Sequence, residues 1–224
     1  MKNNKNIIIT IDGPAGAGKT TIAEMVADKI NFNYVDTGAM YRAMTLKVLK
    51  EGIPFTETVS IEELAQDTDI SIEFFDKEMN IFLDDKNVTE DIRGAEVTDN
   101  TSLVAAIPGV RYKLAKIQRE TAQKFGRVVF EGRDMGSMVF PDASLKIYLD
   151  ASIDERARRR WDELRNKGID VNIDNLKKKI EKRDKRDESR GLAPLRVPDN
   201  AVIIDSTKMS LEEVVNKIIA LLDN

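Results

Sequence analysis

Five short apolar runs along the chain predict the strands of a sheet. The runs are rich in β-branched residues, and segments in which apolar residues recur every three or four positions separate them. They occupy residues 7–11, 33–35, 127–132, 145–150 and 201–205. Strands that alternate with helices in this way predict an α/β fold in which helices flank a five-stranded parallel sheet.

The alternation breaks between about Thr56 and Asn100. Three short segments follow one another there, ISIEFF, EMNIFL and KNV, and Asp-Lys and Asp-Asp pairs separate them. Pairs of this kind are typical of tight turns. We therefore expect a small antiparallel β insert in this region, attached to the α/β frame.

Charged residues dominate a third region, Asp154–Arg190. This stretch carries fourteen Lys/Arg and ten Asp/Glu, so its net charge is +4, whereas the whole chain has a net charge of −4. Charge runs usually form solvated helix faces with ion pairs between residues four apart. The simplest prediction is a helical pair, and its arginines become candidates for a site only through their positions.

Composition narrows the chemistry that the chain can use. The 224 residues include neither cysteine nor histidine, which excludes disulfides, thiolate metal sites and a histidine general base. Catalysis must therefore use Lys, Arg, Asp, Glu, hydroxyl groups, backbone amides or a hard cation. No apolar run reaches the ~18 residues that span a membrane, and the N-terminal one is too short for a signal peptide. We expect a cytoplasmic protein that binds no membrane and, given its negative charge, no nucleic acid.

A phosphate-binding loop is predicted at residues 13–21, GPAGAGKTT, which match G-x-x-x-x-G-K-[ST] between a predicted strand and a predicted helix. Glycines let the backbone N–H groups of such a loop turn toward a phosphate, and the helix start adds its positive dipole. Lys19 is expected to reach the terminal phosphates, and Thr20 to offer a hydroxyl to Mg²⁺. The predicted nucleotide-binding residues are Gly13, Pro14, Ala15, Gly16, Ala17, Gly18, Lys19, Thr20 and Thr21.

The phosphate-binding loop alone does not show whether the protein is a GTPase switch, an ATP-driven motor or a phosphotransferase. A GTPase switch needs a base-reading loop such as N-K-x-D, which NIDN and DKRD do not fit, and a motor needs further domains. Arginines at predicted loop and helix-start positions favour a transferase with an anionic acceptor, because Arg pairs bidentately with phosphate. An acceptor phosphate is ionised near neutral pH and needs no histidine base. A nucleoside monophosphate is the simplest acceptor; another anionic acceptor, or a nucleotide-binding module without turnover, remains open.

Five motifs together give the chain a specific resemblance. They are GPAGAGKTT, VDTGAMYR, VRYKL, EGRDMGSMVFPDA and the pattern R-D-x-x-D-x-x-R-x-x-A-P-L from Arg183 to Leu195. In their order and spacing the chain resembles the bacterial cytidylate kinases, a family of P-loop nucleoside monophosphate kinases. The resemblance implies transfer of the γ-phosphate of ATP to CMP or dCMP with Mg²⁺ as cofactor. It also implies a helical lid and a β insert in the monophosphate-binding lobe.

The resemblance further assigns residues to the acceptor. Those that would hold the acceptor phosphate are Arg42, Arg133 and Arg190. Those that would face the cytosine are Ser102, Arg111 and Asp134. Those that would face the sugar or line the acceptor site are Arg183, Asp187, Thr37 and Tyr41. A carboxylate at Asp134 suits the exocyclic amine of cytosine but would meet a carbonyl in uracil, so CMP and dCMP are expected over UMP.

The charged stretch would be the lid, whose arginines neutralise the transferring phosphoryl group. Arg156 and Arg160 are four residues apart on one helix face, with Arg159 beside them. Together with Lys19 and Arg133, the first two complete the predicted catalytic set.

The resemblance divides one kinase unit, residues 1–224, into three parts. The core would comprise 1–36, 101–152 and 197–224, and the monophosphate-binding lobe 37–100, with the β insert at about 56–100. The lid and acceptor-contact segment would be 153–196. A chain of this size can bury its own core, so a monomer is expected.

Overall fold

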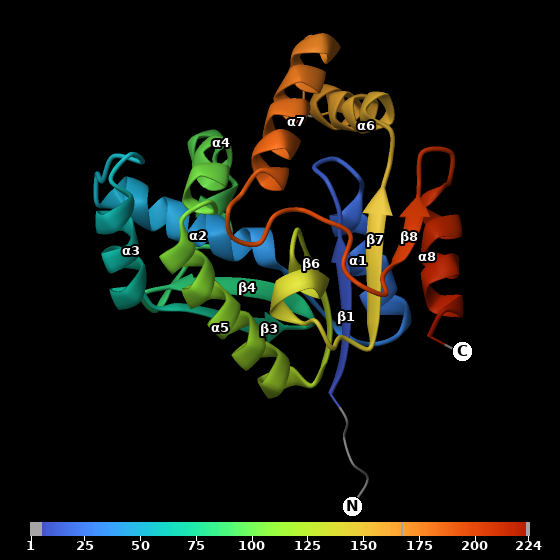
Figure 1. Cartoon of the computed structure of the whole chain (residues 1–224), viewed down its shortest axis with the longest axis horizontal. Helices are drawn as coiled ribbons and strands as arrows, with labels where there is room; N and C mark the ends of the chain where they lie inside the picture. Colours follow the sequence, from blue (N-terminus) through green and yellow to red (C-terminus); the bar gives the residue numbers. More distant parts are fainter. Residues whose placement is uncertain (1–5, 167, 223–224) are drawn as a thin grey trace, which may run out of the picture.

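The computed structural model describes residues 6–166 and 168–222, so residues 1–5, 167 and 223–224 of the predicted core and lid lie outside it. Its centre is a five-stranded sheet with the order β2-β6-β1-β7-β8, in which all neighbouring strands are parallel (Figure 1). The strands are β1 Ile7–Asp12, β2 Asn33–Asp36, β6 Arg127–Gly132, β7 Leu145–Asp150 and β8 Val202–Asp205. All five predicted strands are confirmed, each to within one residue at either end.

Helices cover both faces of this sheet, and each face has its own core. On one face α1 and α8 share an apolar cluster with β1, β7 and β8; on the other, α2 and α5 share a second cluster with β2 and β6. Along β6, Val128 and Phe130 enter one core and Val129 the other, as expected of a strand buried on both faces. The helices are α1 Lys19–Lys29, α2 Thr37–Lys50, α5 Pro108–Phe125 and α8 Leu211–Ala220.

The antiparallel β insert is confirmed, but it is shorter than expected. A three-stranded sheet consists of β3 Ile70–Phe75, β4 Glu78–Leu83 and β5 Lys86–Asn87. Helix α3 (Thr58–Asp67) precedes it, and a single turn η1 (Asp91–Arg93) leads into helix α4 (Ala95–Val104). Neither helix was predicted, because α3 buries only Ile61 and Ala65, and the buried side of α4 mixes valines with hydroxyl residues.

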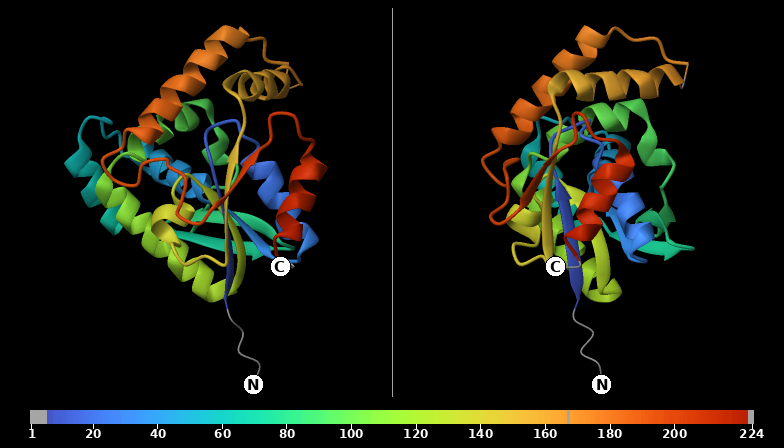
Figure 2. Two further views of the ribbon diagram at one scale, coloured as in Figure 1. Left: turned by 45° about the vertical axis from the view of Figure 1, so that its right-hand side comes forward. Right: turned by 90° about the vertical axis from the view of Figure 1, so that its right-hand side faces the viewer.

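The carboxyl ends of the parallel strands form the edge at which ligands bind in open α/β sheets. The predicted helical pair is confirmed as α6 (Ile153–Asn166) and α7 (Ile173–Glu188), which pack against each other above this edge (Figures 1 and 2). A short π-helical turn, η2 (Met135–Val139), follows β6 at the same edge. Among the described residues, no helix has the length and apolar character needed to cross a membrane.

Candidate active site

The predicted phosphate loop joins β1 to α1 and lies under the α6–α7 pair. Gly13 has φ +150°, and a Cβ there would lie 2.0 Å from the carbonyl oxygen of Leu149 on β7, so only glycine fits. Gly18 precedes α1 in the left-handed conformation with φ 89°. The loop therefore curls tightly and ends at a helix N-terminus, which is the geometry of an anion site.

Lys19, the first residue of α1, is buried in this loop. Its Nζ donates to the carbonyl oxygen of Pro14 at 2.8 Å. Burial, followed by the positive charge of Arg133, lowers the pKa of the Lys19 ammonium from 10.5 to about 7. A buried lysine with this lowered pKa gains its proton most readily when an anion enters the loop.

Two carboxylates stand beside the loop at the ends of β2 and β6. Glu131 accepts a hydrogen bond from the Thr20 hydroxyl at 2.9 Å, and its backbone carbonyl accepts one from Thr37 at 2.7 Å. Burial, with the neighbouring charge of Asp36 adding to it, raises the pKa of Glu131 to about 7. Its Oε2 atom is buried and has no hydrogen-bond partner among the described residues. A hydroxyl and an unpaired carboxylate oxygen thus lie together at the mouth of the loop.

Asp12, the last residue of β1, connects the loop to the turn after β6. Its carboxylate accepts from the backbone N–H groups of Met135 at 2.8 Å and Gly136 at 2.7 Å. Burial raises the pKa of Asp12 to about 6, although these two hydrogen bonds act in the opposite direction. The neighbouring Arg133 and Asp134 are thereby fixed relative to the loop.

The predicted phosphate-holding arginines gather around Asp187 on α7. Arg133 Nε donates to the Asp187 carboxylate at 3.1 Å, and Arg190 pairs with its other oxygen. Arg183 lies in the same cluster, and burial followed by repulsion from Arg133 lowers its pKa to about 10. Its buried Nε has no hydrogen-bond partner within the described chain. Three crowded guanidinium groups and one carboxylate leave an excess of positive charge for an anion to neutralise.

Arg42 lies at the edge of this cluster on α2. Its Nη2 pairs with Asp36 at 2.6 Å, and its charge contributes to the lowered pKa of Arg183. Thr37 and Tyr41 begin the same helix, and burial raises the pKa of the Tyr41 hydroxyl. The first turns of α2 therefore present a hydroxyl, an aromatic ring and a guanidinium toward one site.

The residues predicted to face a base form a second group, in which Arg111 and Asp134 are more deeply buried than the arginines around Asp187. Arg111 on α5 and Asp134 after β6 make an ion pair in which both side chains are almost completely buried. Arg111 also donates to the carbonyl oxygen of Ala105 at 2.8 Å, and its guanidinium lies 5.4 Å from the ring centre of Tyr41. Ser102, on α4, accepts a hydrogen bond from Arg186 of α7. These contacts join five separate segments: α2, α4, α5, α7 and the turn after β6.

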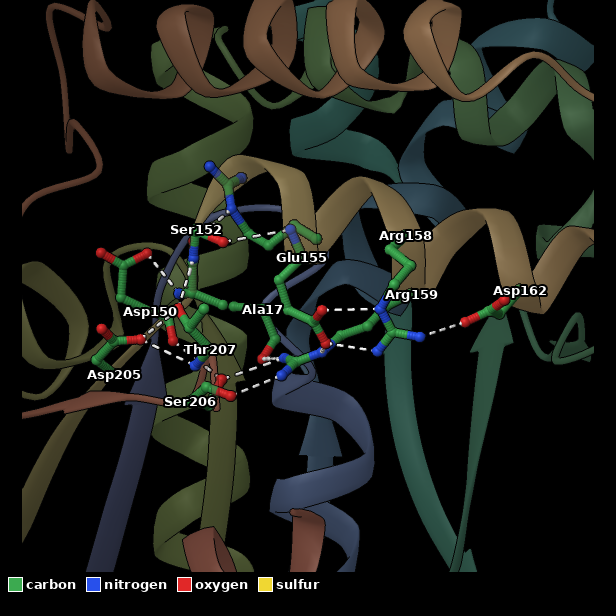
Figure 3. A network of polar contacts seen from close by, with 12 residues as sticks. Ala17, Asp150, Ser152, Glu155, Arg158, Arg159, Asp162, Asp205, Ser206 and Thr207 are labelled. Atoms are coloured by element: carbon green, nitrogen blue, oxygen red, sulfur yellow. Dashed lines mark hydrogen bonds and ion pairs between the residues drawn. The ribbon is translucent and has the colours of Figure 1, made fainter. Parts of the chain in front are cut away.

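Arg156, Arg159 and Arg160 of α6 have different surroundings. Arg156 is buried and donates to the carbonyl oxygen of Ala15 in the loop at 2.9 Å. Arg159 bridges the loop and the segment after β8: it donates to the carbonyl of Ala17 at 3.2 Å and to the hydroxyl and carbonyl of Ser206 at 3.1 and 2.7 Å (Figure 3). Arg160 is 41% exposed and pairs with Glu163 at 2.5 Å. The structure brings Arg156 and Arg159 to the loop but leaves Arg160 on the open side of α6, so the assignment of Arg156 and Arg160 to catalysis stays a prediction.

Several site residues were missed by sequence reasoning. Glu131 and Asp36 end adjacent parallel strands, a position that by itself points to the ligand edge. Asp184 belongs to the motif from Arg183 to Leu195 and is three residues from Asp187, so the two share a helix face. Arg186 gave no such signal, because its contact with Ser102 depends on how α7 crosses α4.

The chain has clear relatives among known proteins. The family model described as Cytidylate kinase matches residues 9–224. The cytidylate kinase of Desulforamulus reducens is 50% identical over 211 residues, which are 94% of each chain. That of Caldicellulosiruptor bescii is 48% identical over 217 residues, covering 97% of this chain and 96% of its own, and that of Pediococcus pentosaceus is 45% identical over 221 residues, covering 99% and 97%.

Solved structures agree on the architecture. A shikimate kinase from Bacteroides thetaiotaomicron superposes with a TM-score of 0.51 at 15% identity, covering 97% of this chain and 99% of that one. A gluconokinase from Sinorhizobium meliloti superposes with a TM-score of 0.50 at 15% identity, covering 97% and 92%. At these identities the likeness concerns the fold alone. The match over residues 9–224 and the identities of 45–50% along nearly the whole length show that the chain belongs to the cytidylate kinase family.

Proposed function

We propose that the protein transfers the γ-phosphoryl group of ATP to CMP and dCMP, giving ADP and CDP or dCDP. One observation carries this proposal beyond family membership: the buried Arg111–Asp134 pair lies close enough to the arginine cluster around Asp187 to interact electrostatically with Arg190 and Asp187. The arginines suit the phosphate of an acceptor, and the buried pair suits its base. A donor loop, a phosphate cluster and a base-reading pair are then contiguous along the carboxyl edge of the sheet.

The reaction follows from bringing two anions together. The loop amides and Lys19 hold the donor phosphates, while Arg42, Arg133 and Arg190 hold the phosphate of CMP. An oxygen of that phosphate forms a bond to the γ-phosphorus as the bond to the bridging oxygen of ADP breaks. The acceptor is already ionised near neutral pH, since its second pKa is about 6, so no base is needed. The α6–α7 pair acts as the lid that excludes water during transfer.

Mg²⁺ fits the groups beside the loop. A hard cation prefers oxygen ligands, and the Thr20 hydroxyl and the unpaired Glu131 Oε2 supply two. The described residues contain no cluster of three or more acidic side chains of the kind that holds a metal alone. This agrees with Mg²⁺ sites in which substrate phosphates provide the remaining ligands. When bound, the ion would neutralise phosphate charge, and Thr20 and Glu131 would hold it.

The base-reading pair explains the expected preference for cytosine. Asp134 accepts hydrogen bonds and donates none when ionised, so it can bind the exocyclic amine of cytosine. Arg111 donates and so suits the ring acceptors. Uracil would place a carbonyl oxygen against the Asp134 carboxylate, so the carboxylate oxygen that Arg111 does not hold would lack a donor. A buried acceptor left without a donor costs about 1–3 kcal/mol or more.

Two other functions make different predictions. A kinase for another anionic acceptor would use the same loop and arginines, and the structural neighbours alone would allow it because their acceptors differ. The buried Arg111–Asp134 pair and the relatives at 45–50% identity favour CMP. A nucleotide-binding module without turnover would bind ATP but release no ADP with any monophosphate.

A coupled assay of ADP release tests the proposal. We expect turnover with CMP and dCMP that is much faster than with UMP, AMP, GMP or shikimate, and slow ATP hydrolysis without an acceptor. Turnover with AMP or shikimate but not with CMP would refute the acceptor assignment. ATP binding without turnover on any acceptor would instead support the binding module.

Exchanging Asp134 for asparagine should weaken the choice of base. An asparagine amide can donate to the uracil carbonyl and no longer carries the charge that favours the cytosine amine. We expect the CMP-to-UMP ratio of kcat/KM to fall by about 10- to 100-fold. Asp142→Asn is the matched control, since Asp142 lies in the same segment but is exposed. An unchanged ratio in Asp134→Asn would remove Asp134 from base recognition.

ATP binding should take up a proton on the alkaline side of neutrality. The Lys19 pKa is lowered from 10.5 to about 7, so at pH 8 most of the free protein holds this lysine neutral. Donor phosphates favour the charged form, which raises this pKa and draws a proton from solution. Calorimetric titration with ATP at pH 8, in buffers of different ionisation enthalpy, should reveal the uptake. Lys19→Met should abolish the proton uptake, and uptake that persists in this variant would point to another group. Lys29→Met is the control: Lys29 is on the same helix but exposed, so this variant should retain the uptake.

A further inference from the structure

Asp184 on α7 is a buried carboxylate for which the proposed reaction has no use. It is 8% exposed. Its Oδ1 accepts from the backbone N–H of Ala15 in the donor loop at 3.1 Å, and its Oδ2 pairs with Arg156. A buried carboxylate costs free energy to desolvate, so two strong partners are needed to keep it there. Both partners lie at the donor loop.

The Asp184–Arg156 pair holds the Ala15 residue by both of its backbone polar groups. The Asp184 carboxylate accepts a hydrogen bond from the Ala15 N–H, and Arg156 donates one to the Ala15 carbonyl oxygen at 2.9 Å. Arg156 is itself fixed by a bond from its Nε to the carbonyl of Ala151 at 3.0 Å. Ala15, Ala157 and Ile180 form a small apolar cluster beside these bonds. This ion pair between α6 and α7 thus fixes Ala15 of the loop against both helices.

The same helix holds the acceptor cluster one turn further on. Asp187 follows Asp184 by three residues, a rise of about 4.5 Å along a helix, and both side chains are buried. Asp187 binds Arg133 and Arg190, whereas Asp184 binds the loop and Arg156. Helix α7 therefore contacts the donor side through one carboxylate and the acceptor side through the next. The helix therefore provides a continuous chain of contacts between the two sites, which is a route by which their occupation can be coupled.

We propose that Asp184 is a positioning residue that couples occupation of the donor loop to occupation of the acceptor cluster through α7. The inference rests on the proposed function, since donor and acceptor are assigned there. Asp184 touches neither substrate; it fixes the register in which the loop and the arginines around Asp187 face each other. Coupling of this kind is reciprocal, so ATP must strengthen CMP binding by the factor by which CMP strengthens ATP binding.

The variant Asp184→Asn separates the positioning role of Asp184 from the effect of its negative charge on ATP binding. The asparagine oxygen can still accept from Ala15, but Arg156 loses its counter-ion. Removal of a negative charge beside the donor loop favours a polyphosphate, so the dissociation constant for ATP in the absence of CMP should stay equal or fall. At saturating CMP, the KM for ATP should rise by the lost coupling factor. Misplacement of the loop should nevertheless lower kcat by about 10- to 100-fold. A merely destabilised protein would instead bind ATP more weakly even in the absence of CMP.

The decisive measurement is the CMP dissociation constant with and without a non-hydrolysable ATP analogue. For the wild type we expect the analogue to tighten CMP binding by at least about fivefold, and for Asp184→Asn we expect no tightening. Glu188→Gln removes one charge from the exposed side of α7 and should behave as the wild type. Full coupling in Asp184→Asn, or none in the wild type, would overturn the inference.

A folding failure can be separated from a loss of coupling. If Asp184→Asn does not fold, as judged by circular dichroism, the double variant Arg156→Met/Asp184→Asn leaves neither charge buried without a partner. Its CMP binding should then be insensitive to the ATP analogue, and retained coupling would refute the role of the pair. Failure of the wild type to phosphorylate CMP would count against the proposed function; wild-type phosphorylation with unaltered coupling in the variants would count against Asp184 alone.

Discussion

Replacing Lys19 with methionine should lower kcat by about 100- to 1,000-fold, the cost of removing one preorganised charge from a transition state. The donor phosphates gain negative charge at the leaving oxygen during transfer, and we propose that the buried Lys19 neutralises this charge. The CMP affinity of the variant should remain that of the wild type, because the proposed acceptor groups lie on α2, α4, α5 and α7 and in the segments after β6 and α7, outside the loop. Single-turnover kinetics and CMP titration measure the two quantities separately.

Stability does not confound the Lys19→Met experiment. Burial lowers the pKa of Lys19, so between about pH 7 and pH 10.5 the unfolded chain binds more protons at this residue than the folded protein does. The contribution of Lys19 to folding stability therefore rises with pH over that window and is unfavourable near pH 7. Methionine removes this penalty, so the unfolding midpoint at pH 7 should not fall. Lys29→Met on the same helix should retain wild-type kcat, and an equal loss of CMP affinity in Lys19→Met would contradict the assignment.

The strands were predictable because each depends on its own sequence. Runs such as IIITID and RVVFEG are short, β-branched and buried on both faces, so they identify strands without reference to distant residues. The cap of α8 was equally local: Ser210 and Glu213 form a reciprocal capping box. Strand order was not predictable in this way, because it depends on which runs pack together. Helix α3 was not predicted because it buries only Ile61 and Ala65, which leave little apolar periodicity in its sequence.

The site was predictable to the extent that its residues belong to motifs. Three motifs have a recognisable spacing: the phosphate loop, the adjacent residues Arg133 and Asp134, and the segment Arg183–Arg190. The structure brings all three to one edge of the sheet. The environment of each arginine was not predictable. Arg156 and Arg160 look equivalent on a helical face, yet Arg156 is buried against Ala15 and Arg160 pairs with Glu163. The difference arises from Asp184, which is 28 residues away in the chain and next to Arg156 in space.

Arg133 is the cation that links the two halves of the site. It donates to Asp187 on α7, and its charge is the largest electrostatic cause of the lowered Lys19 pKa after burial itself. A guanidinium between the donor lysine and the acceptor cluster can contact the phosphoryl group during its transfer. Arginines in that position contribute about 10³- to 10⁵-fold to kcat in other phosphoryl transferases. Holding two anionic substrates together should therefore depend on Arg133 more than on any exposed arginine of the lid.

Arg133→Met should accordingly lower kcat by about 1,000-fold and raise the KM for CMP, as steady-state ADP release would show. Arg133→Lys keeps the charge but not the bidentate geometry, so it should recover only part of the loss. Arg127→Met, at the exposed start of the same strand, should leave both constants unchanged. Loss of the Arg133 charge also removes a repulsion that lowers the Lys19 pKa, so the free variant should hold that lysine more fully protonated at pH 8. Proton uptake on ATP binding should then shrink, whereas undiminished uptake with normal kcat would place Arg133 outside the reacting centre.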